Sequence, residues 1–453
     1  MTATTTPTVI LWFRQDLRLA DNPALDAAVK SGARIVPVYL WSPEEEGGWA
    51  PGAASRWWLH RSLKDLDKRL GEKGSRLLIR RGPALVALRE LAAQCGAQAI
   101  YWNRRYEPAA VAVENMLRDL LPHAGVLAHS FQASLLAEPW SIQTKTGGPY
   151  QVFTPFWRAF LQQVKVGAPI GSPGSIPAPA QWPESLPLDA LQLIPHIPWH
   201  QSLEAHWTPG EATARERLLT FSKGPLAEYD TGRDLPAIDG TSRLSPHLHF
   251  GEVSPRQVWA QASKFSDTSS RYHAEIVWRE FAAHLLHHFP TLPERPKNAA
   301  FEKLAWRNNA QDFEAWCHGR TGIALVDAGM RQLWQTGWMH NRVRMVVGSL
   351  LVKNLLHPWQ DGERWFWDTL VDADLASNAM GWQWVAGTGP DAAPFFRVFN
   401  ADTQAEKFDS SGEYRRRWIP EIGTADYPKP IVDLKSTRQR ALDAYQALRG
   451  PQA

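Results

Sequence analysis

Short apolar runs alternate with longer amphipathic stretches along the first part of the chain. The apolar runs are rich in Val, Ile, Leu and aromatic residues and are typical of buried strands: 9–13, 35–40, 77–79 and 99–102. The stretches between them carry apolar residues at helical spacing: 53–70, 83–95 and 108–121. This alternation predicts a doubly wound parallel sheet, which we expect to form an α/β domain over residues 1–131.

The pattern changes twice beyond residue 131. Over 132–208 the periodicity fades, and 167–198 is dense in Pro, Gly and Ser, as is typical of a long surface connection. We therefore expect an interdomain linker over 132–208 and an all-helical domain over 209–453. The helical stretches of that second domain are 211–221, 255–265, 272–288, 312–317, 323–337 and 342–355.

Composition narrows the class of protein. A chain of 453 residues with 44% hydrophobic and 21% charged residues is typical of a soluble globular protein with two or three domains. The net charge is only +3, so binding of a nucleic acid would need a local basic patch. Cys95 and Cys317 are the only cysteines, which excludes a disulfide framework and a four-cysteine metal or iron–sulfur site. With no signal-like or membrane-length apolar run, we expect a cytoplasmic protein.

The segment Asp372–Trp384 concentrates polar and aromatic chemistry. It holds two carboxylates, one amide and two indoles, in a chain that contains 23 tryptophans. Indoles stack on planar rings, and carboxylate and amide groups can hydrogen-bond to ring nitrogens, so the segment suits a heterocyclic ligand. A helix-rich core that uses Trp as filler explains the segment equally well.

A second cluster lies at 240–246, which reads Gly-Thr-Ser-Arg-Leu-Ser-Pro and follows Tyr229. Two hydroxyls, a guanidinium and closely spaced backbone N–H groups at the start of a helix could hold a phosphate. A helix cap formed by Thr241 or Ser242 is the commoner explanation of such residues.

The helix predicted at 272–288 places Glu275, Trp278 and Arg279 on one face. Such a face could line a ligand pocket. An amphipathic helix with an ion pair on its solvated side is the commoner case for this pattern.

A further segment, 338–345, places Asn341 and Met345 on one helical face. A buried Asn needs hydrogen-bond partners, so Asn341 is either structural or reads a ligand. His340 has no partner at metal-ligand spacing, and we expect it to be structural and the protein to lack a metal site. The basic triplet 415–417 is expected to be a solvated face.

Taken in chain order, these motifs resemble the DNA photolyase/cryptochrome family. The resemblance starts at Leu11–Arg18 and continues over nearly the whole chain to Phe396–Asn400. It implies an N-terminal α/β antenna domain and a C-terminal helical domain that binds FAD. The residues that match the family's FAD site are Tyr229, Thr241, Ser242, Arg243, Leu244, Ser245, Tyr272, Arg279, Arg344, Asp372, Asp374 and Asn378.

The resemblance also implies separate roles within that set. Asp372 would pair with Arg344, and Asp374 would face the pyrimidine edge of the isoalloxazine ring. Asn378 would lie beside flavin N5, where a neutral amide suits the anionic reduced flavin. The family's electron-hopping chain is matched by Trp306, Trp359 and Trp382.

The resemblance is to the members that repair cyclobutane pyrimidine dimers in UV-damaged DNA. The residues that match the dimer pocket are Glu275, Trp278, Asn341, Met345 and Trp384. Trp278 and Trp384 would stack on the flipped-out bases, while Glu275 and Asn341 would hydrogen-bond to their edges. The residues expected at the DNA backbone or the pocket rim are Arg233, Arg342 and Gln404. The branch that repairs 6–4 photoproducts has a second histidine at the position of Asn341.

The reaction implied by this resemblance is light-driven repair by a monomer. Excited, reduced FAD would pass one electron to the dimer, the cyclobutane ring would split, and the electron would return. An antenna pigment, methenyltetrahydrofolate or a deazaflavin, is expected near 102–108, at the end of the fourth strand. Glu294 and Arg295 stand where some folate-binding members carry lysines, so the folate assignment is only weakly favoured over the deazaflavin.

Two alternatives belong to other classes. The residues 410–414 and 372–378 are also similar to plant cryptochromes, which are blue-light photoreceptors without repair activity. Asn378, the complete dimer pocket and a chain that ends at Ala453 without a long signalling extension favour repair. A thermal flavin oxidoreductase is a more distant alternative, because no nicotinamide-binding fingerprint follows any predicted strand.

Overall fold

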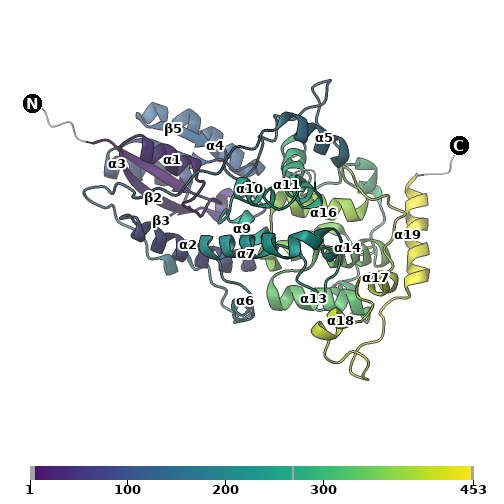
Figure 1. The fold of residues 1–453 in the computed structure, drawn as a ribbon. Helices are drawn as coiled ribbons and strands as arrows, with labels where there is room; N and C mark the ends of the chain where they lie inside the picture. The colour runs from purple at the N-terminus through teal and green to yellow at the C-terminus, as the bar shows by residue number, and fades with distance from the viewer. Residues whose placement is uncertain (1–5, 268–269, 450–453) are drawn as a thin grey trace, which may run out of the picture.

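The computed structural model describes residues 6–267 and 270–449 and places a sheet domain beside a helical domain (Figure 1). The sheet has five parallel strands in the order β3-β2-β1-β4-β5, so β1 lies at its centre. Val9 of β1 is paired with Ile35 of β2 and with Ala99 of β4. The strands are β1 (Thr8–Phe13), β2 (Arg34–Trp41), β3 (Leu78–Arg81), β4 (Ala97–Asn103) and β5 (Leu127–Phe131).

Alternate residues of β1 serve two different cores, because successive side chains of a strand point to opposite faces. Leu11 packs with α1 and α2 on one face, whereas Ile10 packs with α3 and α4 on the other. The helices of this domain are α1 (Pro23–Lys30), α2 (Ala53–Glu72), α3 (Ala84–Cys95) and α4 (Pro108–Leu120), with short 3₁₀ turns η1 (Pro43–Glu45) and η2 (Pro122–Ala124). Helices on both faces of a parallel sheet confirm the expected doubly wound fold.

The rest of the chain is helical, as expected, and is built around two further cores. The α-helices there are α5 (Phe153–Gln163), α6 (His200–Glu204), α7 (Glu211–Lys223), α8 (Tyr229–Gly232), α9 (Ser245–His249), α10 (Pro255–Ala262), α11 (Arg271–His288), α12 (Ala310–Cys317), α13 (Ala324–Thr336), α14 (Asn341–Ser349), α15 (Trp359–Thr369), α16 (Leu375–Ala386), α17 (Ala401–Phe408), α18 (Glu413–Trp418) and α19 (Leu434–Arg449). Shorter turns are the 3₁₀ helices η3 (Leu188–Leu191), η4 (Pro225–Glu228) and η5 (Ala299–Lys303) and the π-helix η6 (Leu350–Asn354). The helix expected at 342–355 therefore ends at Ser349 and continues as a π-helical turn.

The segment expected to be a linker takes part in both domains. Phe153 and Phe156 of α5 belong to the same core as Phe281 of α11. Residues 167–198, which we call the strap, then return over the α/β domain. Two backbone hydrogen bonds join them to that domain: Asp21 N–H donates to Ile170 O (2.8 Å), and Ile35 N–H donates to Pro177 O (2.7 Å). This stretch is thus fixed to the sheet domain along its length.

Buried polar groups join the two domains. The guanidinium of Arg18 is buried and donates to Gly251 O (2.8 Å) and Ala133 O (3.1 Å). Glu211 at the start of α7 accepts from the backbone N–H of Leu19 at 2.7 Å. Because these groups would be unsatisfied apart, the domains pack as one body. In the described ranges, no helix is both long and apolar enough to span a membrane.

Candidate functional site

The loop between α8 and α9 forms a tight turn beside two packed tyrosines. Gly232 and Gly240 approach so closely that a Cβ on Gly240 would lie 2.5 Å from the Gly232 carbonyl oxygen. The ring of Tyr272 packs 5.1 Å from that of Tyr229, edge to face, and burial raises the pKa of both phenols. Arg243 has a left-handed φ of +49°. The approach therefore requires a glycine at position 240.

The helix-cap explanation of this loop is wrong. The N-cap residue of α9 is Leu244, and no side chain in the described part of the chain caps this helix. Thr241 and Ser242 are partly exposed instead. Neither hydroxyl caps α9, and that of Ser242 lies within hydrogen-bonding reach of Tyr272.

An ion pair fixes the first carboxylate of the segment 372–384. Arg344 Nη2 donates to Asp372 Oδ2 at 2.9 Å and to Oδ1 at 3.1 Å, and its Nε donates to Met339 O at 2.8 Å. The Ser245 hydroxyl donates to the same carboxylate at 2.6 Å. The pair of Arg344 and Asp372 that the resemblance implied is therefore present, and it links α9, α14 and α16.

The second carboxylate, Asp374, is the N-cap of α16 and accepts from Ser377 N–H at 2.8 Å. Its Oδ2 lies 3.8 Å from His249 Nδ1. Burial acts to raise the pKa of Asp374, but His249, the charge of Arg279 and the Ser377 N–H hold it well below its ordinary value. Nη1 of Arg279 is buried and has no hydrogen-bond partner among the described residues. An ionised carboxylate and a free guanidinium N–H thus lie together where the pyrimidine edge of a flavin is expected.

Asn378 lies one helical turn after Asp374 and is buried. Its Nδ2 donates to the backbone carbonyl of Glu363 on α15 at 3.0 Å. Both carboxyl oxygens of Glu363 are buried without partners in the described ranges, and burial raises the pKa of this carboxyl well above its ordinary value. Asn378 is therefore anchored to the backbone of Glu363, a residue whose buried carboxyl has a raised pKa.

The expected electron-hopping residues share one core. Trp359 and Trp382 are buried in it, and Trp306 packs against it while partly exposed. The Trp382 ring lies 5.0 Å from that of Phe366 and 6.2 Å from that of Trp316. Trp316 is fully buried, and its sequence neighbours gave no reason to single it out.

The expected dimer residues fall into two groups. On α11, Glu275 is paired with Arg233 rather than with Arg279, and Trp278 stacks on Phe153 with ring centroids 3.7 Å apart and planes 9° apart. The face of 272–288 is therefore not the ordinary solvated face with an internal ion pair. The Trp278 partner comes from α5, which the sequence pattern did not predict.

The second group lies on α14 and α17. Asn341 is exposed at the first turn of α14, and Met345 lies 4.0 Å from Arg342 Nη1. Arg342 pairs with Asp234 at 2.7 Å, next in sequence to Arg233, so this ion pair joins the two groups. The remaining two expected residues, Gln404 on α17 and Trp384 on α16, are partly buried, and Trp384 stacks on Phe399 at 6.3 Å.

His340, which was expected to be structural, is placed in the protein interior. His340 is buried, its Nδ1 accepts from Arg342 N–H at 3.2 Å, and burial lowers its pKa to about 4. Within the triplet 415–417, Arg416 and Arg417 are exposed, as expected of a solvated face, while Arg415 is partly buried and pairs with Asp409. No group of three His, Cys, Asp or Glu side chains in the described ranges could hold a metal ion.

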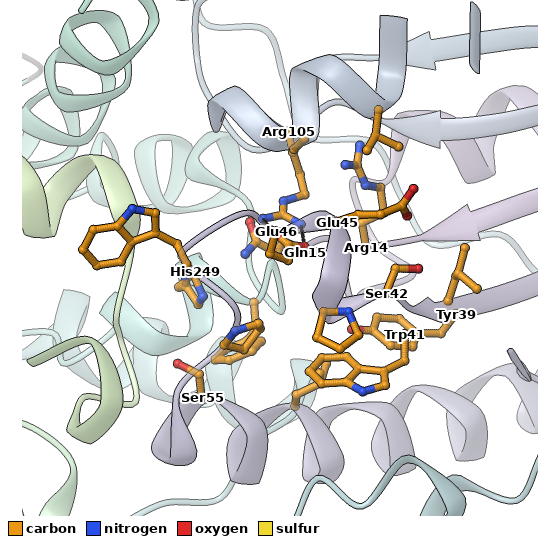
Figure 2. A pocket seen from close by; sticks show the side chains of 18 of the residues that line it. Arg14, Gln15, Tyr39, Trp41, Ser42, Glu45, Glu46, Ser55, Arg105 and His249 are labelled. Carbon is orange, nitrogen blue, oxygen red and sulfur yellow. Dashed lines mark hydrogen bonds and ion pairs between the residues drawn. The ribbon is translucent and has the colours of Figure 1, made fainter. Parts of the chain in front are cut away.

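A cavity lies at the carboxyl ends of the strands, between the two domains, in the region of 102–108 where an antenna pigment was expected (Figure 2). We call it the sheet-edge cavity. Arg105 at its wall is paired with Glu46 (2.6 Å) and Glu107 (3.2 Å), whereas Trp102, which the antenna prediction included, is fully buried in the sheet. The space amounts to about 870 Å³, part of it open to solvent. Its side chains include Trp12, Arg14, Gln15, Tyr39, Trp41, Ser42, Glu45, Glu46, Trp49, Arg105, His249 and Trp367.

Comparisons with known proteins agree with this architecture. Residues 272–426 match the family model for the FAD binding domain of DNA photolyase, and residues 9–180 match that for DNA photolyase. The chain is 47% identical to the deoxyribodipyrimidine photo-lyase of Agrobacterium fabrum, with 98% of each chain covered. It is 37% identical to cryptochrome-1 of Arabidopsis thaliana, with 96% of this chain and 70% of the relative covered. A crystal structure of a bacterial class III photolyase from Agrobacterium tumefaciens superposes with a TM-score of 0.95, at 46% identity and with 99% of each chain covered.

Proposed function

The chain belongs to the DNA photolyase family, and from that premise we propose that it splits cyclobutane pyrimidine dimers in DNA with the energy of light. The observation that supports this best is the arrangement around Trp278. One face of its indole is covered by Phe153, so the ring is fixed before a substrate arrives. Glu275, on the same face of α11, is held by Arg233 and offers an acceptor to a base edge.

The residues of the helical domain fit FAD. The glycine turn at 232 and 240 exposes backbone and hydroxyl groups suited to a diphosphate, and Arg279 presents an unpartnered N–H beside the Asp374 carboxylate. When bound and reduced, FAD supplies under light the electron that splitting of the dimer requires. Asp374 would hold the pyrimidine edge of the ring, and the uncharged amide of Asn378 would add no charge beside it.

We propose that DNA is held by the basic residues around this pocket. Arg342 and Gln404 lie at the rim formed by α14 and α17, and Arg342 is steadied by Asp234. Contacts of this kind fix the register of a DNA strand, whereas stacking on Trp278 and Trp384 selects the flipped-out dimer. Trp382, Trp359 and Trp306 would carry electrons from the surface to the flavin site.

We propose that the sheet-edge cavity holds the antenna pigment, a methenyltetrahydrofolate or a deazaflavin. Four indoles in its wall suit a planar heterocycle. Glu294, which stands where some folate-binding members have lysine, accepts from Trp49 Nε1 at 3.4 Å. Trp41→Ala should lower the amount of pigment that co-purifies and leave FAD content unchanged; unaltered pigment content would place the pigment elsewhere.

The decisive experiment uses the reduced, FAD-containing protein and an oligonucleotide with a thymine dimer. Blue or near-ultraviolet light should restore thymine absorbance, and the same mixture kept in the dark should not. No recovery despite bound, reduced FAD would overturn the repair function. That outcome would favour a cryptochrome-like photoreceptor, the class to which the second relative belongs.

A further inference from the structure

A single layer of side chains separates the sheet-edge cavity from a second, smaller cavity. We call this second space the flavin-edge cavity, because Arg279 and Asp374 line it. Three side chains belong to the walls of both cavities: Gln15, Arg105 and His249. Whatever fills one space is therefore one side chain away from the other.

His249 differs from Arg105 in this shared wall. The two Nη groups of Arg105 are already paired with Glu46 and Glu107. His249 is 8% exposed, and its buried Nδ1 has no hydrogen-bond partner in the ranges the structure describes. The nearest charged atom at this nitrogen is Asp374 Oδ2, at 3.8 Å, which is an ion-pair distance and too long for a hydrogen bond. Of these two side chains in the shared wall, His249 is thus the one with a ring nitrogen still free to form a new hydrogen bond.

The helix that carries His249 touches both carboxylates of the pair 372 and 374. Ser245 at the start of α9 donates to Asp372, and His249 at its end faces Asp374. The imidazole is held edge-on against Phe250, with centroids 4.7 Å apart and planes at 88°. Figure 2 shows His249 among the side chains that line the sheet-edge cavity. One short helix therefore connects this cavity with the two carboxylates.

Several charged groups surround the imidazole. The sheet domain contributes five of them, from three connections: Arg14 follows β1, Glu45 and Glu46 lie at the end of η1, and Arg105 and Glu107 precede α4. From the helical domain they are Arg279 on α11 and Asp374 at the start of α16. The carboxylates of Asp374 and Glu46 face the imidazole from opposite sides of the shared wall. A ligand that covers the sheet-edge side would exclude water and strengthen the remaining pair with Asp374.

We propose that His249 is a positioning residue that couples the two sites, so that a pigment in the sheet-edge cavity and FAD in the helical domain each strengthen binding of the other. The inference rests on the proposed pigment site. Covering the imidazole favours its interaction with Asp374, and an ionised, oriented Asp374 is the form that a flavin edge requires. Coupling between two ligands is reciprocal, and a value in the usual range corresponds to about fivefold or more in each Kd.

The experiment measures the Kd of FAD for the full-length apoprotein, with and without saturating methenyltetrahydrofolate, by fluorescence. In the wild type the pigment should lower the Kd of FAD by about fivefold or more. His249→Phe keeps an aromatic ring but cannot bind Asp374, so both ligands should still bind while the coupling is lost. The matched control is His123→Phe, an exposed histidine of η2 that lines neither cavity and should keep the coupling.

A conservative variant separates positioning from simple packing. His249→Gln retains an N–H donor for Asp374, so it should restore part of the coupling that His249→Phe loses. Equal coupling in the wild type and His249→Phe, or no coupling in a wild type that binds both ligands, would overturn the inference. Absence of pigment binding to the wild type would instead overturn the proposed pigment site.

Discussion

The helical-domain site and the sheet-edge cavity hold their charges in different ways. In the helical domain, each charged side chain has one partner in the same ligand site: Arg344 is paired with Asp372, and Arg233 is paired with Glu275. At the sheet edge, Arg105 is shared between Glu46 and Glu107, which come from the connections that follow β2 and β4. The first site is built from short sequence motifs, whereas the second exists only because parallel strands end at one edge.

This difference predicts that the two sites fail separately. Substitutions inside the helical pairs should remove FAD or DNA binding, whereas the pigment should stay bound, with its Kd raised by no more than the loss of the coupling proposed above. The reverse should hold for the indoles of the sheet-edge cavity.

The largest effect is expected for Arg344→Ala. It leaves the Asp372 carboxylate, whose side chain is 3% exposed, without its counter-charge, so the free energy of unfolding should fall by about 3 kcal/mol. Urea unfolding and FAD content measure this change. Lys30→Ala, which removes an exposed pair with Asp26, is the control and should change stability by less than about 1 kcal/mol. A variant that binds no pigment at all, rather than binding it more weakly, would contradict the separate construction of the two sites.

Glu280 lies between the two regions and should make stability depend on pH. Its carboxylate accepts from Leu136 N–H and Ala137 N–H, and burial raises its pKa to about 7. The unfolded chain therefore releases this proton at lower pH than the folded chain does, so stability should fall as pH rises from about 4.5 to about 7. The total loss is on the order of 2–3 kcal/mol. Glu280→Gln can still accept both hydrogen bonds and should remove this dependence of stability on pH. Urea unfolding measured across the pH range gives the stability of both proteins, and the same pH dependence in both would contradict the assignment.

Trp278→Ala should weaken binding to dimer-containing DNA by about 1–3 kcal/mol, the contribution of one base stack. Binding is measured by fluorescence anisotropy with damaged and undamaged oligonucleotides. Trp334→Ala, which removes a 41% exposed indole on α13, provides the control. Unchanged affinity of the Trp278 variant would remove this residue from the proposed pocket.

The smallest effect is expected for Arg342→Gln. Loss of one phosphate contact should reduce the slope of log Kd against log salt concentration by about 1 and weaken damaged and undamaged DNA alike. Arg118→Gln, on α4 of the other domain, should leave that slope unchanged. A selective loss of binding to damaged DNA would move Arg342 from the backbone to the dimer itself.

Much of the fold followed from sequence because its signals are local. Four strands and the helices α2, α3 and α4 were predicted from apolar periodicity, whereas α1 was not. The partners Arg344 and Asp372 were predicted from the family resemblance. β5 was missed because its residues are partly exposed and include His129 and Ser130, so it lacks an apolar run. α16 escaped notice because most of its surface is buried, which leaves no amphipathic stripe.

Contacts between distant segments could not be predicted in this way. Phe153 stacks on Trp278 across 125 positions, and no spacing rule links two such residues. The sheet-edge cavity likewise draws on residues from Trp12 to Trp367. Such features require the folded topology, because each contributing residue has an ordinary local environment in the sequence.

The path of residues 132–208 has a consequence for inheritance. The chain leaves the sheet domain, places α5 in the helical core, returns along the sheet domain as the strap, and only then enters α7. A recombination event with a single breakpoint would therefore separate the strap from its sheet or Phe153 from Trp278. The two domains should descend together as one gene, and chimeras between relatives should need breakpoints on both sides of α5.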